Sequence, residues 1–312
     1  MSENGYIIET ACRSCRNQQL QTIFSLGTPP IADRLLNEKQ LSEPELLVPL
    51  NLVWCSDCNL LQIRETVSPE ILFQQDYPYY SSVSEAYIRH AANYACEIGK
   101  RKLLDSSSMV LEIACNDGYM LINFVRENIP VLGVDPAKGP AGEAEKKNIP
   151  VIKEFFTVQL AEKLAAENRY ADVIIANNVI AHVPEPNEII RASAHLLKHD
   201  GLMTVEVPWV GDLLGQGEFD TIYHQHYCYF SLKALDTLFR RHGLFINDVQ
   251  HQDVQGGSLR LFINKDENCS PAVMDLLQVE EERGLSDIDS YLDFVDKIKK
   301  LCAALKILLA DL

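Results

Sequence analysis

The sequence has few features of a membrane, secreted or nucleic-acid-binding protein. It contains no run of about 18 or more uninterrupted apolar residues, the length that a membrane-spanning helix needs. Its first residues, MSENGYIIET, lack the basic and apolar regions of a signal peptide, so we expect a cytoplasmic protein with no membrane partner. The formal charge of -16 argues against a nucleic-acid partner, because binding to a phosphate backbone depends on clustered Lys and Arg side chains.

Repeats, low-complexity tracts and a G-x-G-x-x-G motif are also absent. The missing glycine motif disfavours a nicotinamide or flavin cofactor, because those glycines let the backbone approach a pyrophosphate. The composition itself, 47% apolar and 23% charged, is ordinary for a folded globular protein. A length of 312 residues suits two or three structural units.

Four of the nine cysteines form two CxxC pairs, Cys12 with Cys15 and Cys55 with Cys58. A tight turn brings the two thiolates of such a pair to the same side, so both pairs can bind one tetrahedral Zn²⁺. The alternatives are coincidence or two redox-active motifs, but a redox CxxC usually occurs alone at the start of a helix. Four thiolates leave no open position for water, so we expect the metal to be structural.

The rest of the chain shows a helical segment followed by alternating strands and helices. Apolar residues recur along one face of the run SEAYIRHAANYACEIGKRKLL, which predicts a helix ending near residue 104. Beyond it, we expect five strands at residues 109–114, 131–135, 151–153, 171–176 and 202–207. Helical patterns lie between and after them at residues 119–127, 142–147, 158–167 and 186–198.

This alternation implies a parallel sheet that is covered by helices on both faces. A helix at 232–242 and two more strands, at 244–250 and 258–264, complete a mostly parallel seven-stranded α/β sheet. A last amphipathic helix starts at residue 287. We therefore expect four regions, namely a zinc-binding module at 1–66, a helical linker at 67–104, an α/β core at 105–266 and a helical C-terminal segment at 267–312.

The α/β core predicts a ligand site beyond the carboxyl ends of its strands, where the first loop enters a helix. That loop is EIACNDG, residues 112–118. Asp135 ends the second strand, where a carboxylate can accept hydrogen bonds from both ribose hydroxyls, although it could instead cap the next helix. Polar residues that could also be loop caps follow the fourth strand, at Asn177, Asn178 and His182. These residues alone predict a nucleoside-containing ligand.

A series of motifs follows in order along nearly the whole chain: two CxxC pairs, DYPYYSSVSE, LEIACNDGYML, GVDP, ANNVIAHVPE, FDTIYHQHYCYFSL and GGSLRLF. Together they resemble the sugar C-methyltransferases that act on nucleotide-linked ketodeoxysugars. The resemblance implies a Rossmann-like class I methyltransferase core, S-adenosylmethionine as cofactor and a structural zinc near the N-terminus. It also implies that a nucleotide-linked ketosugar is methylated on the carbon next to its ketone.

The resemblance assigns two sets of binding residues. The cofactor set is Glu112, Ala114, Asn116, Asp117, Gly118, Asp135, Asn177, Asn178 and His182. The substrate set is Ser81, Ser82, Gly256, Gly257, Ser258 and Arg260. Backbone amides and a guanidinium in the second set could meet phosphate oxygens, but a glycine-rich turn beside a solvated arginine is the alternative.

Methylating a carbon next to a ketone needs a base that removes its proton and donors that stabilise the enolate oxygen. Histidine suits the base because its pKa lies near neutrality. By resemblance the base is His226, with Tyr223 and either Tyr79 or Tyr80 near the keto oxygen. His224 is a second candidate, because residues 224 and 226 would share one face of an extended segment. A packed cluster of aromatic rings with loop-capping histidines is the alternative for this run.

Two residues depart from the family pattern. Ala114 stands where a glycine is usual, and the backbone accepts alanine there only with a negative φ. Gln225 replaces the acid of a Tyr-His-Glu-His run, and an amide cannot accept a proton. An O- or N-methyltransferase of a small metabolite is therefore the second candidate, and a zinc-ribbon binding protein with a degenerate methyltransferase domain is a third. We also expect the chain to lack the family's usual C-terminal domain.

Overall fold

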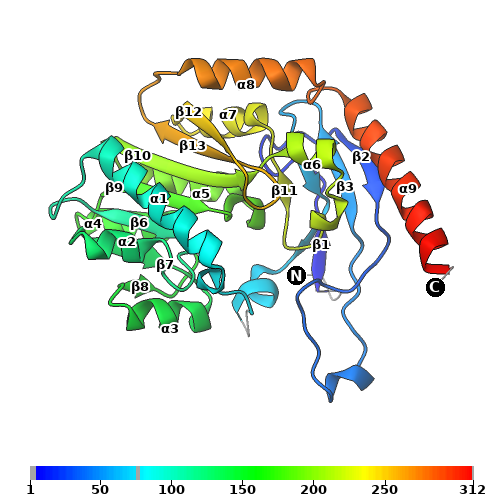
Figure 1. The fold of residues 1–312 in the computed structure, drawn as a ribbon, viewed down its shortest axis with the longest axis horizontal. Coiled ribbons are helices and arrows are strands. Elements are labelled where there is room, and N and C mark those ends of the chain that lie inside the picture. The colour runs from blue at the N-terminus through cyan, green and yellow to red at the C-terminus, as the bar shows by residue number, and fades with distance from the viewer. Residues whose placement is uncertain (1–4, 75–77, 311–312) are drawn as a thin grey trace.

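The computed structural model describes residues 5–74 and 78–310. Its core is a seven-stranded sheet in the order β12-β13-β10-β9-β6-β7-β8 (Figure 1). The parallel strands are β6 (Val110–Ile113), β7 (Val131–Val134), β8 (Val151–Ile152), β9 (Ala171–Asn177) and β10 (Leu197–Pro208). Two antiparallel strands, β13 (Ser258–Asn264) and β12 (Phe245–Gln252), complete one edge. The predicted mostly parallel seven-stranded sheet is confirmed.

Helices cover both faces of this sheet, because successive side chains of each buried strand point to opposite faces. Val110 of β6 packs with residues of the helices on one face, and Leu111 packs with those on the other. The first face carries α1 (Glu85–Lys102), α2 (Leu121–Arg126) and α3 (Lys138–Lys146). The second carries α4 (Val158–Ala166), α5 (Pro186–Leu196) and α7 (Leu232–Arg240).

The remaining helices lie toward the C-terminus and around the loops. They are α6 (Val210–Gln216), α8 (Pro271–Glu282) and α9 (Ile288–Ala310), with short helical turns at Gln40–Ser42, Glu70–Gln74, Ser81–Val83, Ile180–His182 and Phe219–Thr221. The helix expected from residue 287 is confirmed as α9, although Phe294 and Ile298 are buried whereas Leu301 and Leu305 are exposed. Within residues 5–74 and 78–310, none of the helices has the length and apolar composition needed to cross a membrane.

The N-terminal residues form a second, smaller sheet in the order β11-β4-β3-β2. Its strands are β2 (Leu20–Ser25), β3 (Asn51–Cys55), β4 (Leu61–Ile63) and β11 (Cys228–Tyr229), and a separate pair joins β1 (Tyr6–Ile8) to β5 (Glu65–Val67). Strand β11 belongs to the chain after the core sheet's β10, yet it pairs with β4 of the N-terminal module. The module and the core therefore share a sheet.

The four predicted zinc ligands lie together at one end of this small sheet. Their sulfur atoms all lie within 4.8 Å of one another, with 3.5 Å between Cys12 and Cys58 and 3.4 Å between Cys15 and Cys55. Sulfur atoms bonded to one tetrahedral zinc at about 2.3 Å would lie about 3.8 Å apart. The observed separations are far longer than the roughly 2.05 Å of a disulfide, so the arrangement fits a shared metal ion.

Arg13 connects the first cysteine pair to the rest of the fold. Its side chain is 1% exposed, and its guanidinium donates hydrogen bonds to the carbonyl oxygens of Glu65 at 2.9 Å and Pro184 at 3.2 Å. The same group lies 4.9 Å from the ring centre of Tyr227. A buried cation with these partners holds the cysteine turn against β5 and against the loops before α5 and β11.

The loop after β6 has a backbone conformation that differs from the predicted one. Ala114 has φ +55°, so the expectation of a negative φ there is wrong. Hydrogen bonds fix the backbone on both sides, from the Ala114 amide to the Val134 carbonyl at 2.8 Å and from the Asn116 amide to the Asp135 carboxylate at 2.7 Å. The left-handed conformation costs a residue with a Cβ about 1–2 kcal/mol, so Ala114 is held in a strained conformation.

We expect purified protein to contain one zinc ion per chain, and removal of the ion to lower the melting temperature by about 10 °C or more. The double substitution of Cys55 and Cys58 by Ser should have the same effect, measured by metal analysis and calorimetry. Cys96→Ser, which removes an exposed thiol of α1, is the control and should change neither quantity. Clearly less than one zinc per chain, or full stability without it, would contradict the assignment.

Replacing Ala114 by Gly should raise the free energy of unfolding by about 0.5–1 kcal/mol, because glycine adopts a positive φ without steric cost. The same replacement at Ala303, an exposed position inside α9, should lower it by about 1 kcal/mol. Chemical denaturation of both variants measures the two effects. A loss of stability in Ala114→Gly would show that the strain is not present in solution.

Candidate functional site

One cavity of about 410 Å³ lies at the carboxyl ends of the parallel strands. One part of its wall comes from the loops after β6, β7 and β9, through Ala114, Asp135 and Asn177. Another part comes from the turn before β11, through Tyr223 and His226. A single cavity therefore contains residues of both the predicted cofactor set and the predicted catalytic set.

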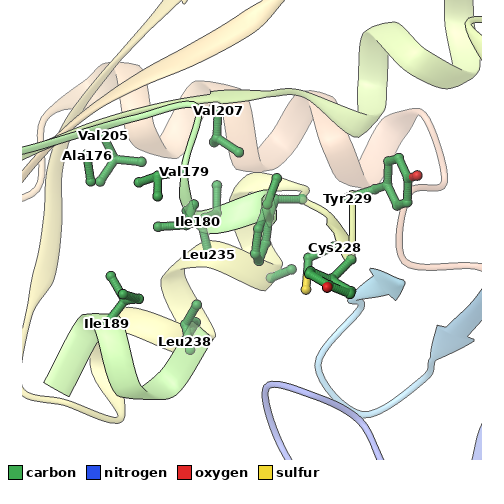
Figure 2. Packing of buried hydrophobic residues seen from close by; sticks show 14 of the residues in the cluster. Ala176, Val179, Ile180, Ile189, Val205, Val207, Cys228, Tyr229, Leu235 and Leu238 are labelled. Carbon is green, nitrogen blue, oxygen red and sulfur yellow. The ribbon is translucent and has the colours of Figure 1, made fainter. Parts of the chain in front are cut away.

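A dense apolar cluster supports the loop that carries His182 into this cavity. Val179 and Ile180 pack among Val205, Leu235 and Leu238, and Figure 2 shows this cluster extending toward β11. Ile180 and both leucines are fully buried. Packing at this density restricts the backbone of residues 180–182, so the position of the histidine ring is determined by the core beneath it.

Asp135 is buried at the cofactor end of the cavity, with 4% of its surface exposed. Its carboxylate accepts hydrogen bonds from the backbone amides of Ala137 at 2.8 Å and Asn116 at 2.7 Å. Ala137, not Asp135, is the N-cap of α3, so the capping interpretation of Asp135 is wrong. Burial raises the pKa of Asp135, and the two amides lower it. A carboxylate has about four acceptor positions, so it can still receive hydroxyl donors from a ligand.

Several buried acceptor atoms around this end have no hydrogen-bond partner among the described residues. They are both carboxylate oxygens of Glu112, Oδ1 of Asp117, Oδ1 of Asn177, Oδ1 of Asn178 and Nδ1 of His182. Burial, together with the charges of Asp135 and Asp117, holds the pKa of Glu112 well above its usual value. An unsatisfied buried polar atom costs about 1–3 kcal/mol. Asn177, Asn178 and His182 line the cavity, whereas Glu112 and Asp117 do not, so the unpartnered atoms of the first three fit a ligand that is rich in hydrogen-bond donors.

The segment before α1 contacts the same loop. Asn116 accepts a hydrogen bond from the Ser81 amide at 2.9 Å, and Asp117 accepts one from the Ser82 hydroxyl. Tyr79 and Ser81 line the cavity, whereas the hydroxyl of Tyr80 lies against Gly139 of α3. Of the two tyrosines proposed near the keto oxygen, only Tyr79 reaches the cavity. Gly118 has φ +76° and a side chain there would collide with Ile149.

The run around His226 is a turn, so the extended conformation expected for it is wrong. The amide of His226 donates to the carbonyl of Tyr223 at 3.0 Å. The turn directs His224 away from the cavity, and its Nε2 lies 3.1 Å from the carbonyl oxygen of Val48 and 3.2 Å from that of Pro49. His224 is 1% exposed and does not line the cavity, so of the two histidines in this run His226 is the one placed to meet a ligand there.

The contacts of His226 define which of its nitrogens carries hydrogen. Nδ1 lies 2.7 Å from the carbonyl oxygen of Thr221, which can only accept, so Nδ1 is the protonated atom. Nε2 lies 3.1 Å from the hydroxyl of Tyr223 and can accept a hydrogen bond from it. Burial lowers the pKa of His226, and burial raises the pKa of Tyr223 to about 12. The site therefore holds a neutral imidazole beside a neutral phenol at pH 7.

Two further side chains lie next to this pair. The ring of His182 is centred 4.5 Å from that of His226, and burial lowers the pKa of His182 well below its usual value. His182 was predicted in the cofactor set, but its position also places it next to the base. Gln225 lines the cavity and donates from Nε2 to the carbonyl of Ala32 at 3.5 Å. The amide thus connects the turn to the N-terminal module.

The predicted phosphate-binding residues after β12 do not line the cavity. Gly256 and Gly257 have φ values of +78° and +112°, and a Cβ at either would collide with the carboxylate of Glu218 or Asp212. Carboxylates this close to the two glycines would repel a phosphate group bound there. Ser258 donates its hydroxyl to the carbonyl of Val254 at 3.0 Å.

Arg260 lies in β13, where it is bonded to other protein groups. Its guanidinium donates to Glu206 at 2.8 Å and to Glu97 at 3.1 Å, and it lies 3.6 Å from the ring centre of Tyr94. The side chain is neither solvated nor directed at the cavity, so both interpretations made from the sequence are wrong for Arg260. Its neighbours show that it is part of a buried ion-pair cluster.

Sequence reasoning missed several residues that line the cavity, among them Asp33, Tyr87, Tyr119 and Gln255. Tyr87 accepts a hydrogen bond from Asn178 at 2.9 Å and stacks on His90. The predicted helix indicated the face on which Tyr87 lies, but nothing in the sequence indicated that Tyr87 contacts a ligand. Asp33 belongs to an irregular loop of the N-terminal module, where no periodic pattern indicates which side chains point inward.

Three family models match the chain in succession. Residues 12–73 match a domain described as zinc binding, residues 87–248 match a methyltransferase domain, and residues 253–312 match a C-methyltransferase C-terminal domain. The expectation that the chain lacks the family's C-terminal domain is therefore wrong. Residues 253–312 include α8 and α9, which the sequence indicated only as a helical segment.

Two relatives are similar to the chain over very different lengths. The C-methyltransferase NovU of Streptomyces niveus is 34% identical over 298 residues, which cover 95% of this chain and 71% of that protein. A ubiquinone biosynthesis O-methyltransferase of Yersinia enterocolitica is 31% identical over 94 residues, which cover 30% of this chain and 39% of that protein. The near full-length similarity to a C-methyltransferase favours carbon over the O- or N-methylation considered from the sequence.

Solved structures with a similar arrangement include the magnesium protoporphyrin IX methyltransferase of Synechocystis with bound S-adenosylhomocysteine. It is 14% identical, with a TM-score of 0.47 over 59% of this chain and 89% of that chain. A methyltransferase of Clostridium acetobutylicum is 12% identical, with a TM-score of 0.46 over 59% of this chain and 92% of that chain.

The methyltransferase domain model covers more than half of the chain, and NovU is similar to nearly all of it. The four-cysteine cluster agrees with the zinc-binding description of residues 12–73. The chain therefore belongs to the C-methyltransferase family, as an S-adenosylmethionine-dependent enzyme with an N-terminal zinc-binding domain.

Proposed function

We propose that the chain methylates the carbon next to the ketone of a nucleotide-linked ketodeoxysugar, with His226 as the base that forms the enolate. The observation that carries the proposal is that Asp135 and His226 line the same cavity. A carbon nucleophile must be generated beside the methyl donor, so the two sites have to open into the same space. The sugar class rests on the resemblance of the sequence motifs.

The residues at the strand ends fit S-adenosylmethionine, which supplies an electrophilic methyl group when bound. Asp135 would accept hydrogen bonds from the ribose hydroxyls. The unpartnered oxygens of Asn177 and Asn178, which line the cavity, would receive the donors of the methionine part, among them its ammonium group. Ala114 lines the cavity and has only a methyl group as its side chain, so the loop would leave room for the cofactor there.

His226 has the geometry of a base aimed into the cavity. The hydrogen bond from Nδ1 to Thr221 fixes the tautomer and leaves the lone pair on Nε2. The C–H bond next to the ketone would break, its electron pair would form the enolate, and Nε2 would take the proton. Tyr223 donates to that lone pair in the structure, so its hydroxyl would have to turn to the keto oxygen, where it would stabilise the enolate.

His182 and Gln225 would support this step without taking the proton. The neutral ring of His182 packs edge-on to the base at 4.5 Å and limits its rotation. Gln225 has no acidic group, so any proton relay through this position is absent. The base therefore depends on its own environment, rather than on a neighbouring acid in the same turn.

Replacing His226 by Asn should lower kcat by about 100- to 10,000-fold, because general-base catalysis contributes rate factors of that size. Binding of S-adenosylmethionine, measured by calorimetry, should stay within about twofold, since His226 lies outside the residues proposed to hold it. The assay follows a labelled methyl group into a dTDP-linked ketodeoxysugar, with product NMR to locate it. His199→Asn, an exposed histidine, is the control.

Substantial turnover in His226→Asn would show that another group is the base. His224→Asn separates the two histidines of the run, because it should lose stability through its contacts with Val48 and Pro49 but keep measurable turnover. Label found on oxygen or nitrogen in the product would contradict the carbon acceptor.

Replacing Asp135 by Asn should weaken S-adenosylmethionine binding by about 10- to 100-fold, because a hydrogen bond to a charged group contributes about 1.5–3 kcal/mol. Calorimetric titration of the full chain measures the dissociation constant. Asp275→Asn on α8 removes the same charge outside this cavity and should leave the constant unchanged. An unaltered constant in Asp135→Asn would place the ribose elsewhere.

A further inference from the structure

A loop of the zinc-binding module forms part of the wall of the cavity next to the proposed base. It connects β2 to β3 and contacts the His226 turn at both of its ends. Near its end, the carbonyl groups of Val48 and Pro49 lie within hydrogen-bonding distance of His224. Near its start, the carbonyl of Ala32 accepts the hydrogen bond from Gln225. These contacts hold residues 32 and 33 beside the turn.

Asp33, which follows Ala32, lines the same cavity as Tyr223 and His226. Its φ is +60°, a left-handed conformation that aspartate adopts more readily than most residues with a Cβ. Its carboxylate makes no hydrogen bond or ion pair with any residue in 5–74 or 78–310 that the structure shows. Asp33 is exposed, so solvent screens part of its charge, and the remainder is available to a group in the cavity.

The base needs a partner of negative charge when it is protonated. The groups in direct contact with His226 are the Tyr223 hydroxyl, the His182 and Tyr229 rings and the Thr221 carbonyl, none of which is an anion at pH 7. Three carboxylates that line the cavity come from the nearby segments, namely Asp33, Glu218 and Asp220, and of these Asp33 acts on the pKa of His226. Burial lowers the pKa of His226, and the charge of Asp33 acts in the opposite direction and raises it. The hydrogen bond to the Thr221 carbonyl offsets part of the cost of burying an imidazolium here, and the charge of Asp33 offsets a further part.

We propose that Asp33 is a positioning residue for the reaction, whose carboxylate stabilises the imidazolium formed when His226 takes the substrate proton. It supplies from the zinc-binding module the negative charge that the neutral Gln225, next to the base, cannot supply. The inference rests on the proposed role of His226. The proton moves from the substrate carbon to Nε2 of His226, and Asp33 remains ionised throughout.

The test titrates His226 in the full-length protein by NMR of labelled histidine, with its signal assigned by its loss in His226→Asn. In Asp33→Asn, the pKa of His226 should fall by about 0.5–1 unit, because an opposite charge has been removed. The base must be neutral to act, so activity is lost as the pH falls through this pKa. The acidic limb of kcat/KM for the dTDP-linked ketodeoxysugar should therefore move to lower pH by the same amount.

The pH-independent value of kcat/KM should also fall, by about two- to fivefold, since a weaker base removes the proton more slowly. Asp33→Glu, which keeps the charge, should restore most of both effects. Glu38→Gln removes one negative charge from the same loop at an exposed position that does not line the cavity, and should shift neither quantity. Zinc content should match the parent protein in all three variants, and the melting temperature should match it in Asp33→Asn and Glu38→Gln, since asparagine also adopts a positive φ.

Unchanged titration of His226 in Asp33→Asn would overturn the inference, as would an equal shift in Glu38→Gln, which would show a general effect of net charge. The proposed function has a separate outcome. If His226→Asn keeps turnover, His226 is not the base, yet the NMR titration still shows whether Asp33 and His226 interact.

Discussion

The pairing of β11 with β4 is the contact on which the arrangement of the site depends. Cys228 and Tyr229 lie opposite Gln62 and Leu61, in a sheet whose other strands belong to the zinc-binding module. His226 comes two residues before this strand, so the module determines where the turn leaves the core and where the imidazole points. The metal, which stabilises the small sheet, therefore acts on the proposed base through backbone hydrogen bonds rather than through its own chemistry.

A second buried arrangement supports the cofactor end of the cavity. Arg260 and His90 both contact the carboxylate of Glu206, and together they join β13 and β10 to α1. From α1, Tyr87 reaches the side chain of Asn178 at the edge of the cavity. Removing one charge from such a cluster would leave the others buried without a partner. Arg260, which the sequence suggested as a phosphate ligand, therefore stabilises the packing of β13 and β10 against α1 and does not line the cavity.

Much of the fold follows from patterns in the sequence, because each pattern has one main physical cause. Short apolar runs indicated the parallel strands, and two CxxC pairs indicated a metal site whose sulfur atoms do lie together. Spacing could not separate His224 from His226, since alternation assumes an extended chain and residues 223–226 form a turn. The choice of His226 came from the resemblance alone. The position of Asp33 beside the turn could not be predicted either, because it depends on contacts between segments almost two hundred residues apart along the chain.

The shared sheet has a practical meaning for anyone who exchanges parts between enzymes of this family. A boundary drawn after residue 66 or 73 would separate β4 from β11, although the two strands are hydrogen-bonded to each other. A transferred zinc-binding module would then lack β11, the strand at the edge of its sheet. The β11 of the recipient enzyme would have to pair with a β4 of different sequence. Recombination should instead transfer the segment from Thr221 to Phe230 together with the module, as a unit that is discontinuous in the gene and continuous in space.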